Sequence, residues 1–138
     1  MLYSYKMKAG IIMKVAVIGS RGLQVDHLEN YLPEGATEIV SGGARGIDTC
    51  AKNYALAHGL KLTEFMPEYG KYGRGAPLRR NITIIEYADT VLAFWDGKSR
   101  GTKYVIDNCK KRNIPVAVYQ PAAGSEGDQF QCTSIPTT

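Results

Sequence analysis

The chain has 138 residues, of which 44% are hydrophobic and 22% charged, a composition typical of one globular domain with a buried core. Its formal net charge is only +4, from 17 basic and 13 acidic residues, so charge alone does not make it a nucleic-acid binder. No apolar run approaches the roughly 18 residues of a membrane-spanning helix. The three unpatterned cysteines indicate reduced thiols and a cytoplasmic location, without a disulfide framework.

The first half of the chain alternates between strand and helix patterns. Residues 14–20, KVAVIGS, form an apolar run typical of a strand buried on both faces. A short helix is expected at about 25–32, and a second strand at 37–43. Apolar residues between 47 and 58 then fall at helical spacing, and Gly59 follows as a helix stop.

The second half continues this alternation. We expect a strand at 60–66, a helix at 78–89, a strand at 90–95, a helix at 102–112 and a strand at 114–120. The pattern predicts an α/β fold: one Rossmann-like three-layer α/β/α domain around a five-stranded parallel sheet. The commonest topologies of this class favour the strand order 3-2-1-4-5.

Three regions are expected along the chain. Residues 1–12 are a poorly patterned lead-in, residues 13–120 form the Rossmann-like domain, and residues 121–138 form a flexible tail rich in Pro, Gly, Ser and Thr.

Glycine-rich turns follow three of the expected strands: GSRG at 19–22, SGGARG at 41–46 and WDGKSRGT at 95–102. Because parallel strands end at the same edge of a sheet, we expect these turns to lie together. Glycine lets backbone amides approach a ligand, and the start of the following helix attracts an anion. The long loop 67–77 begins at the same edge and leads into the next helix.

Basic residues are concentrated at this edge, and guanidinium groups suit bidentate phosphate binding. Nine of the 17 are expected there: Arg21, Arg45, Lys71, Arg74, Arg79, Arg80, Lys98, Arg100 and Lys103. The first turn does not match G-x-G-x-x-G and the chain has no G-x-x-x-x-G-K-[ST], which disfavours NAD or ATP held in the usual way. We expect neither a cofactor nor a metal. The candidate phosphate- and ligand-binding residues are Gly19, Ser20, Arg21, Ser41, Gly42, Gly43, Arg45, Gly46, Asp48, Arg80, Asn81, Asp96, Gly97, Ser99, Gly101 and Thr102.

Some candidates have structural alternatives. Asp48 is expected in the first turn of its helix, where a carboxylate stabilises the helix dipole as readily as it binds a ribose. Asp96 either accepts a hydrogen bond from a sugar hydroxyl or starts a turn. Arg80 opposes the dipole at a helix start, which favours ligand contact. Ser20 and Ser41 have no expected histidine partner, so no catalytic residue is assigned.

The motifs IVSGGARGIDTCAKNYALAHGL, GRGAPLRRN, ADTVLAFWDGKSRGT and IPVAVY, in this order, resemble the SLOG superfamily of Rossmann-like domains. That superfamily includes the LOG phosphoribohydrolases and the DNA-processing protein A of natural transformation. The resemblance spans residues 14–119 and is closest to the small stand-alone YspA-type members. It implies a nucleotide-derived ligand at the glycine-rich edge and leaves a homo-oligomer open. The LOG enzymes carry a catalytic glutamate where this chain has Val105, whereas Arg80 matches their arginine.

The main interpretation is the binding, for sensing or processing, of a phosphorylated nucleotide or nucleotide-derived ligand. Two alternatives stay open. One is a LOG-like hydrolase of nucleotide N-glycosidic bonds that uses a non-standard carboxylate. The other is single-stranded DNA binding like that of DNA-processing protein A, which we rank below a nucleotide. A scaffold whose inherited pocket serves protein contacts is a further interpretation, and no membrane partner is expected.

Overall fold

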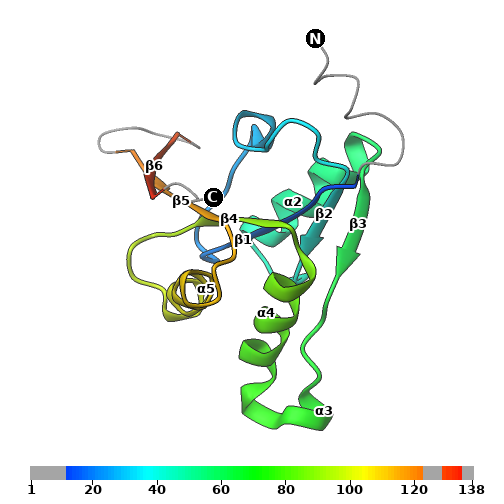
Figure 1. The fold of residues 1–138 in the computed structure, drawn as a ribbon, viewed down its shortest axis with the longest axis vertical. Coiled ribbons are helices and arrows are strands. Elements are labelled where there is room, and N and C mark those ends of the chain that lie inside the picture. The colour runs from blue at the N-terminus through cyan, green and yellow to red at the C-terminus, as the bar shows by residue number, and fades with distance from the viewer. Residues whose placement is uncertain (1–11, 123–128, 135–138) are drawn as a thin grey trace.

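The computed structural model describes residues 12–122 and 129–134 (Figure 1). Residues 1–11 of the expected lead-in, and residues 123–128 and 135–138 of the expected tail, lie outside this description. The elements in chain order are β1 (Lys14–Gly19), η1 (Leu28–Asn30), β2 (Glu38–Ser41), α2 (Ile47–Ala57), β3 (Lys61–Glu64), α3 (Tyr69–Tyr72), η2 (Gly73–Gly75), α4 (Ala76–Tyr87), β4 (Thr90–Phe94), α5 (Arg100–Lys111), β5 (Val116–Pro121) and β6 (Phe130–Ser134).

The strands form a mixed sheet with the order β3-β2-β1-β4-β5-β6. The first five are parallel, so the expected order 3-2-1-4-5 is confirmed for them. The expectation of five strands in a wholly parallel sheet is wrong, because β6 pairs antiparallel with β5. The segment Phe130–Ser134 is only five residues long and lies in the Gly-, Ser- and Thr-rich stretch expected as a tail, so the short alternation of Phe130 and Cys132 with polar residues did not indicate pairing.

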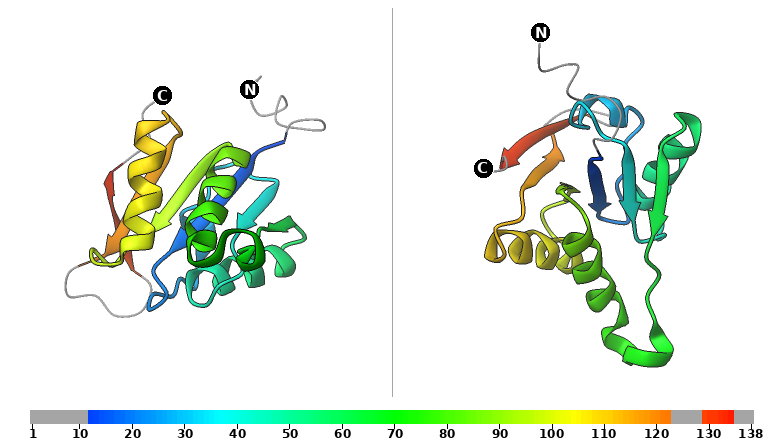
Figure 2. Two further views of the ribbon diagram at one scale, coloured as in Figure 1. Left: turned by 90° about the horizontal axis from the view of Figure 1, so that it is seen from below. Right: turned by 45° about the vertical axis from the view of Figure 1, so that its right-hand side comes forward.

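Helices cover both faces of the sheet, which gives three layers (Figure 2). On one face, Ile84 and Ile85 of α4 and Val105 of α5 pack against β1 and β4. On the other face, Ile47 and Ala51 of α2 pack with η1 against the same strands. Because apolar side chains leave the central strands on both sides, β1 and β4 are buried almost throughout.

The helix expected at about 25–32 is a single 3-10 turn, η1. Val25 and Leu28 are both buried, and a spacing of three residues is met by one 3-10 turn as well as by an α-helix. Pro33 disfavours the helical conformation for the residue before it, so the turn is not extended into an α-helix.

The segment 67–77, expected as a loop, contains α3 and η2. These two short elements project away from the sheet beyond the end of β3 and return the chain to α4 (Figures 1 and 2). The long connection therefore forms a structured arm beside the carboxyl ends of the strands.

Candidate functional site

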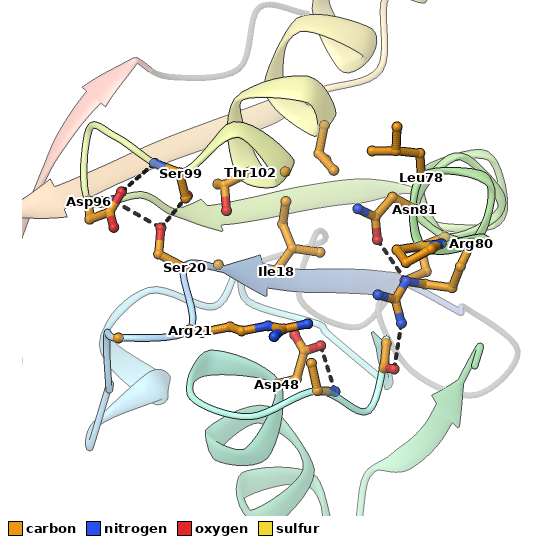
Figure 3. A pocket seen from close by; sticks show the side chains of 18 residues that line it. Ile18, Ser20, Arg21, Asp48, Leu78, Arg80, Asn81, Asp96, Ser99 and Thr102 are labelled. Carbon is orange, nitrogen blue, oxygen red and sulfur yellow. Dashed lines mark hydrogen bonds between the residues drawn. The ribbon is translucent and has the colours of Figure 1, made fainter. Parts of the chain in front are cut away.

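The glycine-rich turns after β1, β2 and β4 converge with the first turns of α4 and α5 around a cavity of about 390 Å³ (Figure 3). Parallel strands end on the same edge, and each turn here opens a helix or leads toward one. The candidate residues that line the cavity are Gly19, Ser20, Arg21, Gly42, Asp48, Arg80, Asn81, Asp96, Ser99, Gly101 and Thr102.

The other candidates lie close by but do not line this cavity: Ser41, Gly43, Arg45, Gly46 and Gly97. The Ser41 hydroxyl is fully buried and accepts the amide of Gly43 at 3.4 Å, which shapes the turn. Gly46 has a φ of +76° and packs against the backbone of Arg21, so its role is the close approach of two turns. Gly97, with a φ of +85°, allows the turn after β4.

One wall of the cavity is apolar, and the sequence analysis missed it. The wall consists of Ile18 at the end of β1, Pro77, Leu78 and Ile84 on α4, and Val105 on α5. Gly22 and Ala44, in the turns after β1 and β2, are the other lining residues that were not predicted. Ile84 and Val105 also belong to the buried core, and their helical spacing indicates a core face without indicating a ligand. The cavity thus joins a polar rim to an apolar surface, as small-molecule sites do.

Arg80 fixes the start of α4 against the ends of β2 and β3. Its Nε donates to Oδ1 of Asn81 at 2.8 Å, and its Nη1 donates to the carbonyl oxygens of Gly42 at 2.7 Å and Phe65 at 3.3 Å. Burial lowers the pKa of the Arg80 guanidinium and the charge of Asp48 opposes that shift. An arginine remains cationic in such a setting, so Arg80 brings a fixed positive charge to the cavity.

Asp48, in the first turn of α2, is only 8% exposed. Its Oδ2 accepts a hydrogen bond from the amide of Ala44 at 3.0 Å, and the amide of Gly42 lies nearby. Burial raises the pKa of Asp48, while these amides and the charge of Arg80 oppose the rise. The amide of Ala44, in the turn expected to hold a phosphate, is thus already bonded to a carboxyl group of the chain itself.

Ser20 and Ser99 link the turns after β1 and β4. Their hydroxyl oxygens lie 2.7 Å apart, and the amide of Asp96 donates to Ser20 Oγ at 3.1 Å. Oδ1 of Asp96 accepts the amides of Lys98 and Ser99, each at 2.8 Å. These amides lower the pKa of Asp96, which supports the interpretation that it starts the turn as a carboxylate.

Two kinds of hydrogen-bond donor at the cavity, one a cationic side chain and the other backbone amides, have no partner within the described part of the chain. The exposed Arg21 makes no hydrogen bond or ion pair with the described residues, and Figure 3 shows its side chain extending toward Asp48. The amides of Gly101 and Thr102 lie in the first turn of α5, where no helical carbonyl precedes them. The positive end of the helix dipole adds to their attraction for an anion.

Residues 12–122 and 129–134 contain no group of three or more His, Cys, Asp and Glu side chains that could hold a metal ion. His27 and His58 border a separate hollow beside α2, away from Ser20. Over the same residues, no helix is both long enough and apolar enough to cross a membrane.

The fold and the convergent turns define a Rossmann-like α/β domain with its candidate site at the carboxyl ends of the strands. A family model described as DNA recombination-mediator protein A matches residues 5–69. The chain belongs to this family, within the SLOG superfamily. The matched residues include β1, β2 and β3, and therefore the β1 and β2 sides of the cavity.

Two relatives extend this comparison. The Gene 61 protein of Mycobacterium phage D29 is 34% identical over 84 residues, which cover 56% of this chain and 67% of the phage protein. DNA processing protein A from Helicobacter pylori has a similar structure, with a TM-score of 0.58 and 25% identity over 84% of this chain and 68% of that one. That protein is described as having a unique single-stranded DNA binding mode.

Proposed function

We propose that the cavity binds the phosphate of a nucleotide, with the sugar or base against the apolar wall. The observation that carries this proposal is that Arg21 and the first turn of α5 line the same cavity. Arg21 has a fork of donors with no partner in the described chain, and Gly101 and Thr102 offer amides that the helix does not use. A bound phosphate would accept hydrogen bonds from these groups, and not from the Ala44 amide, which already donates to Asp48.

The size of the cavity and its apolar wall support a ligand larger than inorganic phosphate. Its volume of about 390 Å³ lies within the range of about 300–1,000 Å³ that is usual for small-molecule sites. Leu78 is 41% exposed at the opening, where it offers an apolar surface to a base or a sugar. The geometry does not favour N-glycosidic hydrolysis, because Val105 is buried on the apolar wall and the carboxylates of Asp48 and Asp96 accept hydrogen bonds from backbone amides.

A second candidate function is the binding of single-stranded DNA. It is favoured by the likeness to DNA processing protein A from Helicobacter pylori, which is described as binding single-stranded DNA. The same donors of the cavity, which would bind the phosphate of a nucleotide, would then bind the phosphate of one nucleotide in the strand. The two functions differ in their response to salt, because a strand that contacts several cations releases several counterions.

Calorimetric titration with a nucleoside 5′-monophosphate, the matching nucleoside and inorganic phosphate tests the proposal. We expect the monophosphate to bind more tightly than either part. Arg21→Gln should weaken it by about 1.5–3 kcal/mol, roughly 10- to 150-fold in Kd, which is the range for hydrogen bonds to a charged group. Arg45→Gln is the matched control, because Arg45 is exposed on the neighbouring turn and does not line the cavity. Equal losses in both variants would contradict the proposal.

A further inference from the structure

The hydroxyl of Thr102, in the first turn of α5, is a polar group without a partner in the described part of the chain. Thr102 is only 6% exposed, yet its hydroxyl makes no hydrogen bond with any described residue. Figure 3 shows this side chain pointing into the cavity, which Thr102 lines. Because buried polar groups are nearly always hydrogen-bonded, the unused hydroxyl indicates that a polar ligand atom lies beside it when the cavity is filled.

Asn81 presents a hydrogen-bond donor to the same cavity. Its Oδ1 accepts a hydrogen bond from Nε of Arg80 at 2.8 Å. A guanidinium group can only donate, so the amide oxygen must face Arg80 and the amide nitrogen must face away from it. Nδ2 of Asn81 makes no hydrogen bond within residues 12–122 and 129–134, and Figure 3 shows the side chain turned toward the cavity. Arg80 therefore holds the amide group in one orientation, with a donor available to a ligand.

Asp48 presents the complementary acceptor. It lines the cavity and is only 8% exposed. The Ala44 amide donates to its Oδ2, but an ionised carboxyl group has about four acceptor positions, so acceptor capacity remains. Arg80, which donates to Asn81, also favours the ionised form of Asp48 through its charge. The donor of Asn81 and the acceptor of Asp48 thus share one guanidinium neighbour, and a hydroxyl group, which both donates and accepts, suits the pair.

The positions of these two residues indicate which part of a nucleotide they would contact. The proposed phosphate donors are Arg21 and the first turn of α5, and Figure 3 shows Arg21 extending toward Asp48. Asn81 follows Leu78 by one turn on the same face of α4, and Leu78 offers the apolar surface proposed for the base. The sugar of a nucleotide joins the phosphate to the base. Asp48 and Asn81 therefore lie where the sugar hydroxyls of such a ligand would be.

We propose that Asp48 and Asn81 make the cavity selective for nucleotides that contain ribose over those that contain 2′-deoxyribose. This inference rests on the phosphate site proposed above. The 2′-hydroxyl donates to the Asp48 carboxylate and accepts a hydrogen bond from Nδ2 of Asn81. A 2′-deoxy ligand leaves both groups unpaired, and a site that hydrogen-bonds a hydroxyl rejects the analogue without it. The inference also separates the two candidate functions, because DNA has no 2′-hydroxyl.

Calorimetric titration with two matched pairs of compounds tests the inference: adenosine 5′-monophosphate with its 2′-deoxy analogue, and ribose 5-phosphate with 2-deoxyribose 5-phosphate. We expect each ribose compound to bind about 10- to 100-fold more tightly than its deoxy counterpart, the range for leaving a buried polar group unpaired. The same ratio in both pairs assigns the preference to the sugar and not to the base.

Two variants test the residues that carry the preference. Asn81→Asp keeps the oxygen that accepts from Arg80 and removes the donor. Asp48→Asn keeps an acceptor for the Ala44 amide and removes the carboxylate. Each variant should reduce the ratio of ribose to deoxyribose affinity by about fivefold or more. A structural disturbance weakens both sugars alike and therefore does not change this ratio.

The matched controls are Asn53→Asp on α2 and Asp107→Asn on α5, because both residues are exposed and neither lines the cavity. They should leave the ratio unchanged. Equal affinity of the parent chain for the two sugars, or a ratio that persists in both Asn81→Asp and Asp48→Asn, would overturn the inference.

Arg21→Gln separates this inference from the proposed function. If Arg21→Gln weakens both sugars and the parent chain does not distinguish them, the phosphate proposal stands and the sugar inference fails. If Arg21→Gln changes no affinity, the phosphate proposal fails even where the ribose preference holds. A parent chain that binds none of the four compounds at millimolar concentration would contradict both.

Discussion

The hydroxyl of Tyr87, at the end of α4, donates a 2.6 Å hydrogen bond to Oε2 of Glu38, the first residue of β2. Thr63 of β3 donates to the same oxygen at 2.7 Å, and Glu38 is only 3% exposed. A carboxylate is thus buried at the amino ends of the strands, opposite the carboxyl ends that hold the cavity, where it joins α4 to β2 and β3.

Tyr87→Phe should lower the free energy of unfolding by about 1.5–3 kcal/mol, because it removes a hydrogen bond to a buried charge without changing the ring. Denaturant unfolding at pH 7 measures the effect. Tyr104→Phe is the control, since Tyr104 is 37% exposed on α5 and should change the stability by less than about 0.5 kcal/mol. A similar loss in both variants would contradict the role assigned to the hydroxyl.

The same carboxylate should make stability depend on acid. Burial raises the pKa of Glu38, but the hydrogen bonds from Tyr87 and Thr63 and the charges of Lys61 and Lys14 outweigh it, so the pKa lies below its ordinary value. A carboxyl whose pKa is lower in the folded state stabilises the fold above the unfolded-state pKa, and that stabilisation is lost as pH falls through the folded-state pKa. Stability should therefore fall as pH drops below about 4.5. Glu38→Gln should flatten that fall in unfolding experiments between pH 7 and pH 3.

Asp48 should show the opposite sign. Its pKa is raised by burial, so ionisation is unfavourable in the folded state, and that cost is present above the folded-state pKa and absent below the unfolded-state value. Asp48→Asn keeps an oxygen that can accept the Ala44 amide and removes the charge. We expect it to raise the thermal midpoint at pH 7, with a difference from the parent chain that shrinks toward acidic pH. A variant that is less stable at pH 7 would show that the carboxylate is needed for the fold.

Gly42→Ala should disturb the cavity through Arg80. A Cβ at this position would lie 2.5 Å from Nη1 and 2.8 Å from Cζ of Arg80, so the guanidinium must move away from the Gly42 carbonyl. We expect weaker nucleotide binding and a stability loss of about 1–3 kcal/mol, measured by calorimetry and denaturant unfolding. Gly70→Ala is the control, because a Cβ there meets no atom within 4 Å. Unchanged nucleotide affinity in Gly42→Ala would show that the position of the Arg80 guanidinium does not matter for binding.

Phe130→Ala tests the contribution of β6. The Phe130 ring lies 5.1 Å from that of Phe94 and 5.9 Å from that of Tyr31, measured between centroids. Because the side chain is only half-buried, we expect a loss of about 2–3 kcal/mol, below the usual cost of a fully buried Phe→Ala change. Nucleotide affinity should be unchanged, since β6 does not line the cavity. Gln131→Ala, at an exposed position of the same strand, should have little effect.

The order of the strands and the convergence of the glycine-rich turns could be predicted because continuous apolar runs and glycine turns are local signals. The antiparallel strand β6 could not, because its stability comes from Phe130 packing on residues distant in sequence, such as Tyr31. The polar rim of the cavity was predicted for the same local reasons. The apolar wall was not, because Ile84 and Val105 have the same spacing whether or not a ligand touches them.

The cavity takes its walls from both halves of the chain, from β1 and β2 on one side and from β4, α4 and α5 on the other. A ligand bound there would contact both halves of the chain and hold them together. Saturating the protein with ligand should therefore suppress local unfolding around the cavity as well as raise the melting temperature. Amide hydrogen exchange at the start of α5 should slow together with that at the end of β1.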